Sequence, residues 1–314
     1  VRARYESLSG QFRAGRDGSD QLLALRTLVH GRATFDGLSL GMELQDSRTY
    51  LDDAGTPLSS SYVNAIDILQ AYAEVDVPSP FEAGNASVTL GRQTVSIGSK
   101  RQIERVSYAN VIKAYTGFHY AAASETRGLH VIAVVPIDRR PGDQASVGDN
   151  EIVADAEQWN RLIWGAHYRH QLDELWLEGF VYGLNESDSD TFPTPNRRYV
   201  TPGIRVFRAP SVGDWDLDVE AALRFGSRRA SSAATDTTDL DVAAGMLLAK
   251  LGYTFDTPWR LRVGAEYYYA SGDEDPNDGR FDQYERLFGG RRTDLNNTSL
   301  HGPLTPANLS VPGV

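Results

Sequence analysis

Apolar and polar residues alternate along most of the chain between Gly37 and Tyr269, in segments of about ten residues. The segment from Trp259 to Tyr269 shows the pattern best, because its odd positions are apolar or aromatic and most of its even positions are charged. Successive side chains of a β-strand point to opposite faces, so such a strand needs an apolar medium on one side and water on the other. The pattern predicts an all-β protein, an antiparallel transmembrane β-barrel.

About thirteen strands can be predicted from this alternation. The connectors after even-numbered strands are short and those after odd-numbered strands are mostly longer and polar, as in a barrel with short periplasmic turns and long outer loops. The predicted strands are Arg2 to Leu8, Gln21 to Phe35, Leu38 to Arg48, Ala65 to Val77, Ser87 to Ser99, Lys113 to Ala122, Gly128 to Ile137, Gln158 to Arg169, Glu174 to Asn185, Tyr199 to Arg208, Trp215 to Gly226, Asp241 to Phe255 and Trp259 to Ala270.

The pleat also predicts which side chains face lipid. In the third strand these are Leu38, Leu40, Met42 and Leu44, and in the eleventh strand the odd positions from Trp215 to Phe225. Two stretches, Leu22 to Arg32 and Ser87 to Ile97, change phase midway, which indicates a bulge or strands that extend beyond the membrane. Aromatic residues gather near strand ends, as interfacial girdles require.

The composition excludes several classes of protein. No apolar run approaches the ~18 residues of a spanning helix, so a helical membrane protein is excluded. The net charge of −11 argues against nucleic acid as a partner. Cysteine is absent, so disulfides and thiolate chemistry are absent too. Lysine occurs only at Lys100, Lys113 and Lys250 among 31 basic residues, and this arginine bias suits carboxylate recognition, internal ion pairs or simply a GC-rich genome.

Several motifs resemble the alginate-export family of bacterial outer-membrane β-barrel porins. They are Arg2 to Glu6, Gly91 to Gln93 with Gly98 and Arg101, Leu251 to Phe255, Ala270 to Asp273, and Phe288 to Arg292, with Ala307, Asn308 and Val311 to Gly313 at the end. The resemblance implies an eighteen-stranded barrel in the bacterial outer membrane that passes anionic uronate polymers, or other solutes, through an arginine-rich pore. Residues 1–314 are then expected to be one barrel domain that lacks its C-terminal strands.

Nine arginines are candidates for lining the pore or binding its cargo. Arg92, Arg101 and Arg105 are the strongest, because the polar stretch from Lys100 to Asn110 holds basic residues against only Glu104. Guanidinium groups in a narrow aqueous space would favour carboxylates over cations. The alternative is that inward arginines pair with acids on neighbouring strands and form rigid ladders. The other six candidates are Arg161, Arg169, Arg205, Arg224, Arg260 and Arg262.

Other chemistry finds little support in the sequence. The acidic loop Asp273 to Asp282 has part of the spacing of a calcium loop, but Asp278 stands where an EF-hand needs glycine. The six histidines are scattered, and no nucleophile with a base, phosphate loop or zinc motif is present. No enzyme activity, metal or cofactor is therefore expected.

The sequence therefore predicts a passive, anion-leaning outer-membrane channel for saccharides such as alginate or other uronates. Two alternatives stay open: an uptake porin for other small nutrients, and a surface barrel whose lumen is blocked by inward loops or crossing ion pairs. The expected partners are an anionic saccharide or small carboxylate, membrane lipid and lipopolysaccharide, together with periplasmic secretion components if a polymer is exported.

Overall fold

The computed structural model describes residues 1–9, 18–53, 56–189, 192–233, 235–275, 277–285 and 287–290. Within them one sheet follows the chain order from β1 to β7 and from β9 to β14, with every neighbouring pair on this path antiparallel. The strands are β1 Arg2–Leu8, β2 Asp20–Phe35, β3 Leu38–Tyr50, β4 Asn64–Val77, β5 Asn85–Gln93, β6 Tyr115–Ala123, β7 Arg127–Asp138, β9 Arg161–Leu172, β10 Leu175–Glu186, β11 Arg198–Arg208, β12 Asp214–Arg229, β13 Asp239–Thr254 and β14 Arg262–Ala270.

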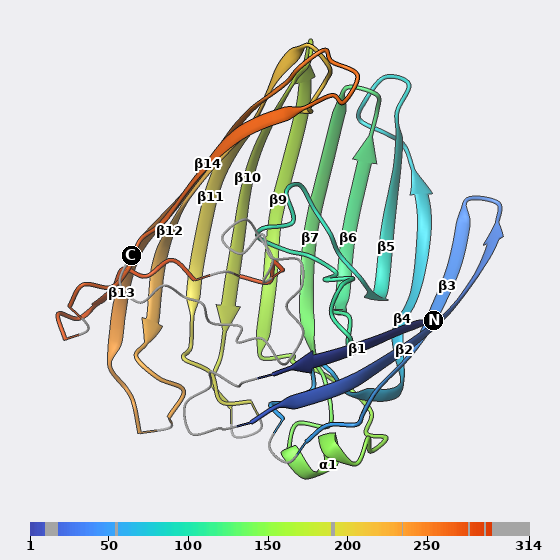
Figure 1. Cartoon of the computed structure of the whole chain (residues 1–314), viewed down its shortest axis with the longest axis vertical. Coiled ribbons are helices and arrows are strands. Elements are labelled where there is room, and N and C mark those ends of the chain that lie inside the picture. The colour runs from blue at the N-terminus through green and yellow to red at the C-terminus, as the bar shows by residue number, and fades with distance from the viewer. Residues whose placement is uncertain are drawn as a thin grey trace.

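Figure 1 shows these strands side by side as one curved wall, open between its first and last strands. Two short strands lie off this path: β8 (Ala156–Glu157) pairs with β7, and β15 (Arg280–Phe281) pairs with β13. The helix α1 (Gln144–Gly148) lies at the end of the wall where the longer connectors gather (Figure 1). The side chain of Asp143 caps it by accepting a hydrogen bond from the Ser146 amide.

The wall has the burial pattern of an inverted protein, apolar outside and polar inside. In β3 the residues Leu40, Met42 and Leu44 are exposed, whereas Glu43 and Gln45, on either side of Leu44, are buried. In β12 Leu223 is 55% exposed, while its neighbour Arg224 is 1% exposed. A soluble sheet would bury the leucines, so this confirms the predicted facing of both strands.

The phase change predicted near Ser87 to Ile97 has a structural cause. The strand β5 ends at Gln93, so the predicted extension to Ser99 is wrong. Residues 94–114, here called the inner loop, leave the sheet and turn to the face that carries the buried polar residues. In β2 the alternation is lost because the half from His30 onward is exposed on both faces. The partner strands β3 and β4 also contain register shifts near Glu43 and Gln45.

The inner loop is held by an apolar cluster inside the wall. Ile103 of the loop packs among the inward-facing side chains of six strands, together with Val95 and Ile97. The described residues after β14, 271–275, 277–285 and 287–290, lead back across the wall toward this loop (Figure 1). There Phe288 forms a parallel bridge with Ile103, and its amide donates to the Gln102 carbonyl at 2.8 Å. The inner face is therefore partly apolar. The sequence pattern predicted only polar side chains on this face.

Candidate functional site

A row of histidine, arginine and carboxylate side chains crosses the inner face from β9 to β12. Antiparallel register places Glu178 of β10 beside Arg205 of β11. Arg205 lies 3.2 Å from the Glu178 carboxylate and 2.6 Å from that of Asp218. On the other side of Glu178, His167 Nε2 lies 3.4 Å from its carboxylate. Cross-strand pairs of opposite charge of this kind stabilise a sheet and hold their side chains rigid.

Arg101 joins the inner loop to this row. Its guanidinium lies 2.9 Å from the Asp218 carboxylate and also pairs with Glu220. Arg101 is only 7% exposed and Glu220 is fully buried. Arg101 is therefore a buried tether between loop and wall. The expectation that it faces few carboxylates is wrong.

Arg105 and Arg92 are paired in the same way. Arg105 makes hydrogen bonds of 2.9 and 3.1 Å to the two carboxylate oxygens of Glu43. Arg92 lies 2.8 Å from Glu157, in the connector between β7 and β9. The three arginines expected to be free of acidic neighbours are thus all bound to carboxylates of other segments. The two residues of each pair are so far apart in sequence that the alternation within a strand cannot predict the contact.

The remaining candidates lie in four kinds of place. Arg161 pairs with Glu186 at 2.5 Å, and Arg262 with Asp216 at 2.5 Å. Arg224 is buried between the rings of Tyr199 and Tyr284, 5.1 and 4.6 Å from their centroids. Arg260 is exposed in the turn before β14, at φ +47°, and β14 begins only at Arg262, so the predicted start of this strand at Trp259 is wrong. Arg169 lies over the ring of Trp176, and no carboxylate of the described residues forms an ion pair with it.

Two polar features of the structure could not be predicted from the sequence. His119 of β6 and His130 of β7 are linked by a 3.0 Å hydrogen bond, and His130 neighbours His167 with 6.4 Å between ring centroids. Spacing along the chain gives no hint of this row, because it arises from register across three strands. Arg2 and Arg26 donate to carbonyls of Tyr108 and Ala109 and hold the far end of the inner loop.

The second missed feature is a carboxyl pair where the β7–β9 connector meets β4. The Asp155 amide donates to Asp67 at 2.5 Å, and its carboxyl accepts from the Arg140 amide and from Asn64, each at 2.7 Å. Burial, together with the Asp67 charge, raises the pKa of Asp155 to about 7, although these hydrogen bonds and Arg92 act in the opposite direction.

The carboxyl pair predicts a pH dependence. In the unfolded chain Asp155 loses its proton near its ordinary value of 3.8, but the folded state keeps it until about 7. The folded state therefore binds more protons between these limits, and stability falls as pH rises through them. We expect Asp155→Asn to flatten this fall, as measured by the urea midpoint at pH 5 and pH 8. An unchanged slope in the variant would contradict the assignment to Asp155.

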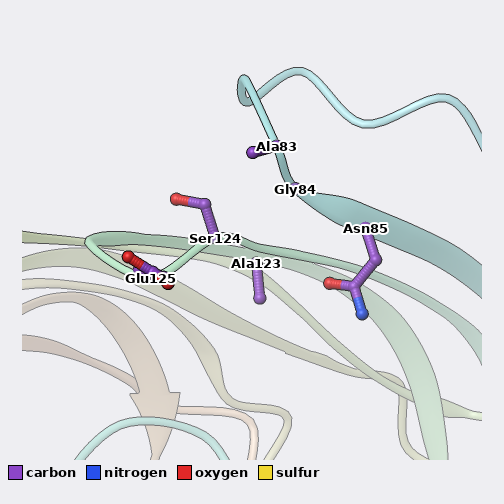
Figure 2. Close-up of a pocket in the computed structure, with 6 residues that line it drawn as sticks. All are labelled: Ala83, Gly84, Asn85, Ala123, Ser124 and Glu125. Carbon is purple, nitrogen blue, oxygen red and sulfur yellow. The ribbon is translucent and has the colours of Figure 1, made fainter.

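Two further regions carry no site. A shallow hollow between the β4–β5 and β6–β7 turns is lined by small residues with Asn85 and Glu125 (Figure 2), away from the charged row. In the acidic loop the carboxylates of Asp275 and Asp278 accept hydrogen bonds from the amides of Asn277 and Arg280. No group of three or more metal-binding side chains gathers within the residues that the structure describes.

The strand order, the antiparallel register and the inverted burial define a protein of the β-barrel class. No helix in the described part of the chain is long and apolar enough to cross a membrane. The family model described as Alginate export matches residues 1–311, so the chain belongs to the alginate export family. The resemblance drawn from the sequence motifs is thereby confirmed. Among curated proteins, none matches the chain.

Proposed function

We propose that this chain forms most of the wall of an outer-membrane channel that passes anionic saccharides by diffusion. The observation that carries the proposal is the inverted wall, with leucines outside and paired arginines and carboxylates inside. An outer face of this kind requires a lipid environment. Membership of the alginate export family supports a uronate cargo. Transport of this kind needs no covalent step and no cofactor.

The wall needs further strands to close around a pore. β1 and β14 are not paired with each other, and unpaired backbone groups in lipid cost several kcal/mol each. We propose that the strands that complete the wall come from parts of the protein outside the residues that the structure describes. Lipopolysaccharide would then contact the outer loops, and export of a polymer would require periplasmic components that deliver it.

The mechanism follows from charge. Arginines along the inner face lower the barrier for a carboxylate to enter, and several weak contacts let it leave again. Because most of these arginines are bound to wall carboxylates, the local potential is set by the few that are not. Selectivity for anions would therefore be moderate and would depend on salt.

A second candidate function is a barrel with a lumen closed at rest. The observation that favours it is the inner loop, which is tied to the wall by Arg101 and Arg105 and packed against Phe288. Uptake of small acidic nutrients through the same pore is a third candidate, because the inner face gives no direction of transport.

The test is the reversal potential of the full-length protein in a planar bilayer under a KCl gradient, with and without an oligouronate. We expect anion selectivity and a current that the oligouronate blocks. Cation selectivity without block would reject the uronate cargo. A protein that inserts but does not conduct would favour the closed barrel.

A further inference from the structure

We infer that Arg169 is the carboxylate-binding residue of a subsite for one uronic acid ring, at the end of the inner face near the short turns. The inference deepens the proposed function and rests on it for the identity of the sugar. It starts from a cavity of about 310 Å³ between the inner loop and the strands β7, β9, β10 and β11. Ligand pockets begin at ~300 Å³, so this space suits a single ring better than a polymer segment.

Arg169 is the cation of this cavity that lacks an acidic counterpart. Glu178 is its cross-strand neighbour, but the Glu178 carboxylate turns to Arg205 and His167 instead. Arg205, the other arginine of the cavity, is neutralised by Glu178 and Asp218. The described residues therefore leave one uncompensated positive charge here, and Arg169 is exposed to solvent.

The side chain of Arg169 is positioned by its neighbours on two strands. Its guanidinium lies over the Trp176 ring, 4.8 Å from the centroid. On the other side it passes over Gly128, where an added Cβ would lie 2.7 Å from Arg169 Nε. Stacking on an aromatic face leaves the edge of the guanidinium available, and this edge presents the N–H fork that binds a carboxylate through two hydrogen bonds.

The rest of the lining suits the hydroxyl groups and apolar face of a sugar. His130, Ser96 and His167 contribute polar atoms, and Trp176 and Phe207 contribute rings. His167 is buried, and its Nδ1 has no hydrogen-bond partner within the described residues. Ser96 and Gly98 belong to the inner loop, which therefore forms one side of the subsite.

The experiment compares Arg169→Gln with the full-length wild type, using a monouronate, an oligouronate and the neutral sugar with the same ring. Binding is followed by the fluorescence of Trp176, identified by its loss in Trp176→Phe, and block of the current is measured in a bilayer. We expect the variant to bind the uronates about 10- to 100-fold more weakly, the range for one lost hydrogen bond to a charged group. Binding of the neutral sugar should not change.

Two further variants separate charge from position. Arg127→Gln removes one charge from the neighbouring position of β7, whose side chain lies on the opposite face, and should bind like the wild type. Gly128→Ala keeps Arg169 but displaces it, so an intermediate loss is expected. This variant also shows the effect without altering any ionisable group.

The outcomes distinguish the subsite from the channel. If uronates block the wild type and Arg169→Gln equally, the subsite is wrong and the channel function stands. If uronates bind through Arg169 but never block a current, the channel function fails and the subsite stands. If the wild type binds no uronate, both are overturned.

Discussion

Replacing Leu223 with arginine is expected to lower the free energy of unfolding in a membrane by ~2–4 kcal/mol. Leu223 lies near the middle of β12 and is 55% exposed on the outer face. An arginine on the lipid face near the bilayer midplane costs ~2–4 kcal/mol. In a protein surrounded by water, the same change at an exposed site would alter stability by about 0.5 kcal/mol or less. The result thus decides whether this face meets lipid or water.

The measurement is the free energy of unfolding of full-length protein in lipid vesicles, obtained from urea titration. The matched control is Leu261→Arg, because Leu261 is similarly exposed at 58% but lies in the turn before β14. Near the interface the same substitution costs only ~0–1 kcal/mol. Equal losses in the two variants would contradict a membrane-spanning wall, and so would full tolerance of Leu223→Arg.

The strands could be predicted from the sequence because a barrel wall uses both faces of every strand. The prediction Arg2 to Leu8 coincides with β1, and Tyr199 to Arg208 differs from β11 by one residue. The alternation of apolar and polar residues predicts strands wrongly where it continues into a segment that has left the sheet. Val95 and Ile97 continue an apparent strand, yet they pack inside the barrel wall as part of the inner loop.

The candidate site could be predicted only in part. That arginines would lie on the inner face followed from the pleat, as for Arg205 and Arg224. The partners of the inner-loop arginines could not be predicted in this way. Arg101 and Glu220, for example, are 119 residues apart and meet only through the fold of the inner loop. The alternation along a strand contains no information on such contacts. Arg92, Arg101 and Arg105, which have few acidic neighbours in sequence, are therefore paired with carboxylates of distant segments. Arg169 stands out only when its neighbours are known.

The tether at Arg101 has the second large expected effect. Arg101→Ser would leave Glu220, which is fully buried, and Asp218 without this cation. Breaking a buried pair by removing one partner costs ~3–5 kcal/mol, because the other charge stays buried. The wall has its own hydrogen-bonded strands, so we expect the loss to release the inner loop and leave the barrel folded. Conductance should rise, and trypsin should cleave after Lys100 or Arg105 faster than in the wild type.

Two comparisons isolate the tether from a general loss of stability. Arg32→Ser removes an exposed pair with Glu74, for which ~0–1 kcal/mol is expected, and it should leave conductance and cleavage unchanged. Without Arg101, the carboxylates of Asp218, Glu220 and Glu178 share Arg205 as their one arginine within the described residues. Adding Asp218→Asn and Glu220→Gln to Arg101→Ser removes this excess of negative charge and should restore part of the protection, since neutral partners of similar shape cost less when buried. If Arg101→Ser alone has the conductance and the cleavage rate of the wild type, then Phe288 and the apolar cluster hold the inner loop without Arg101.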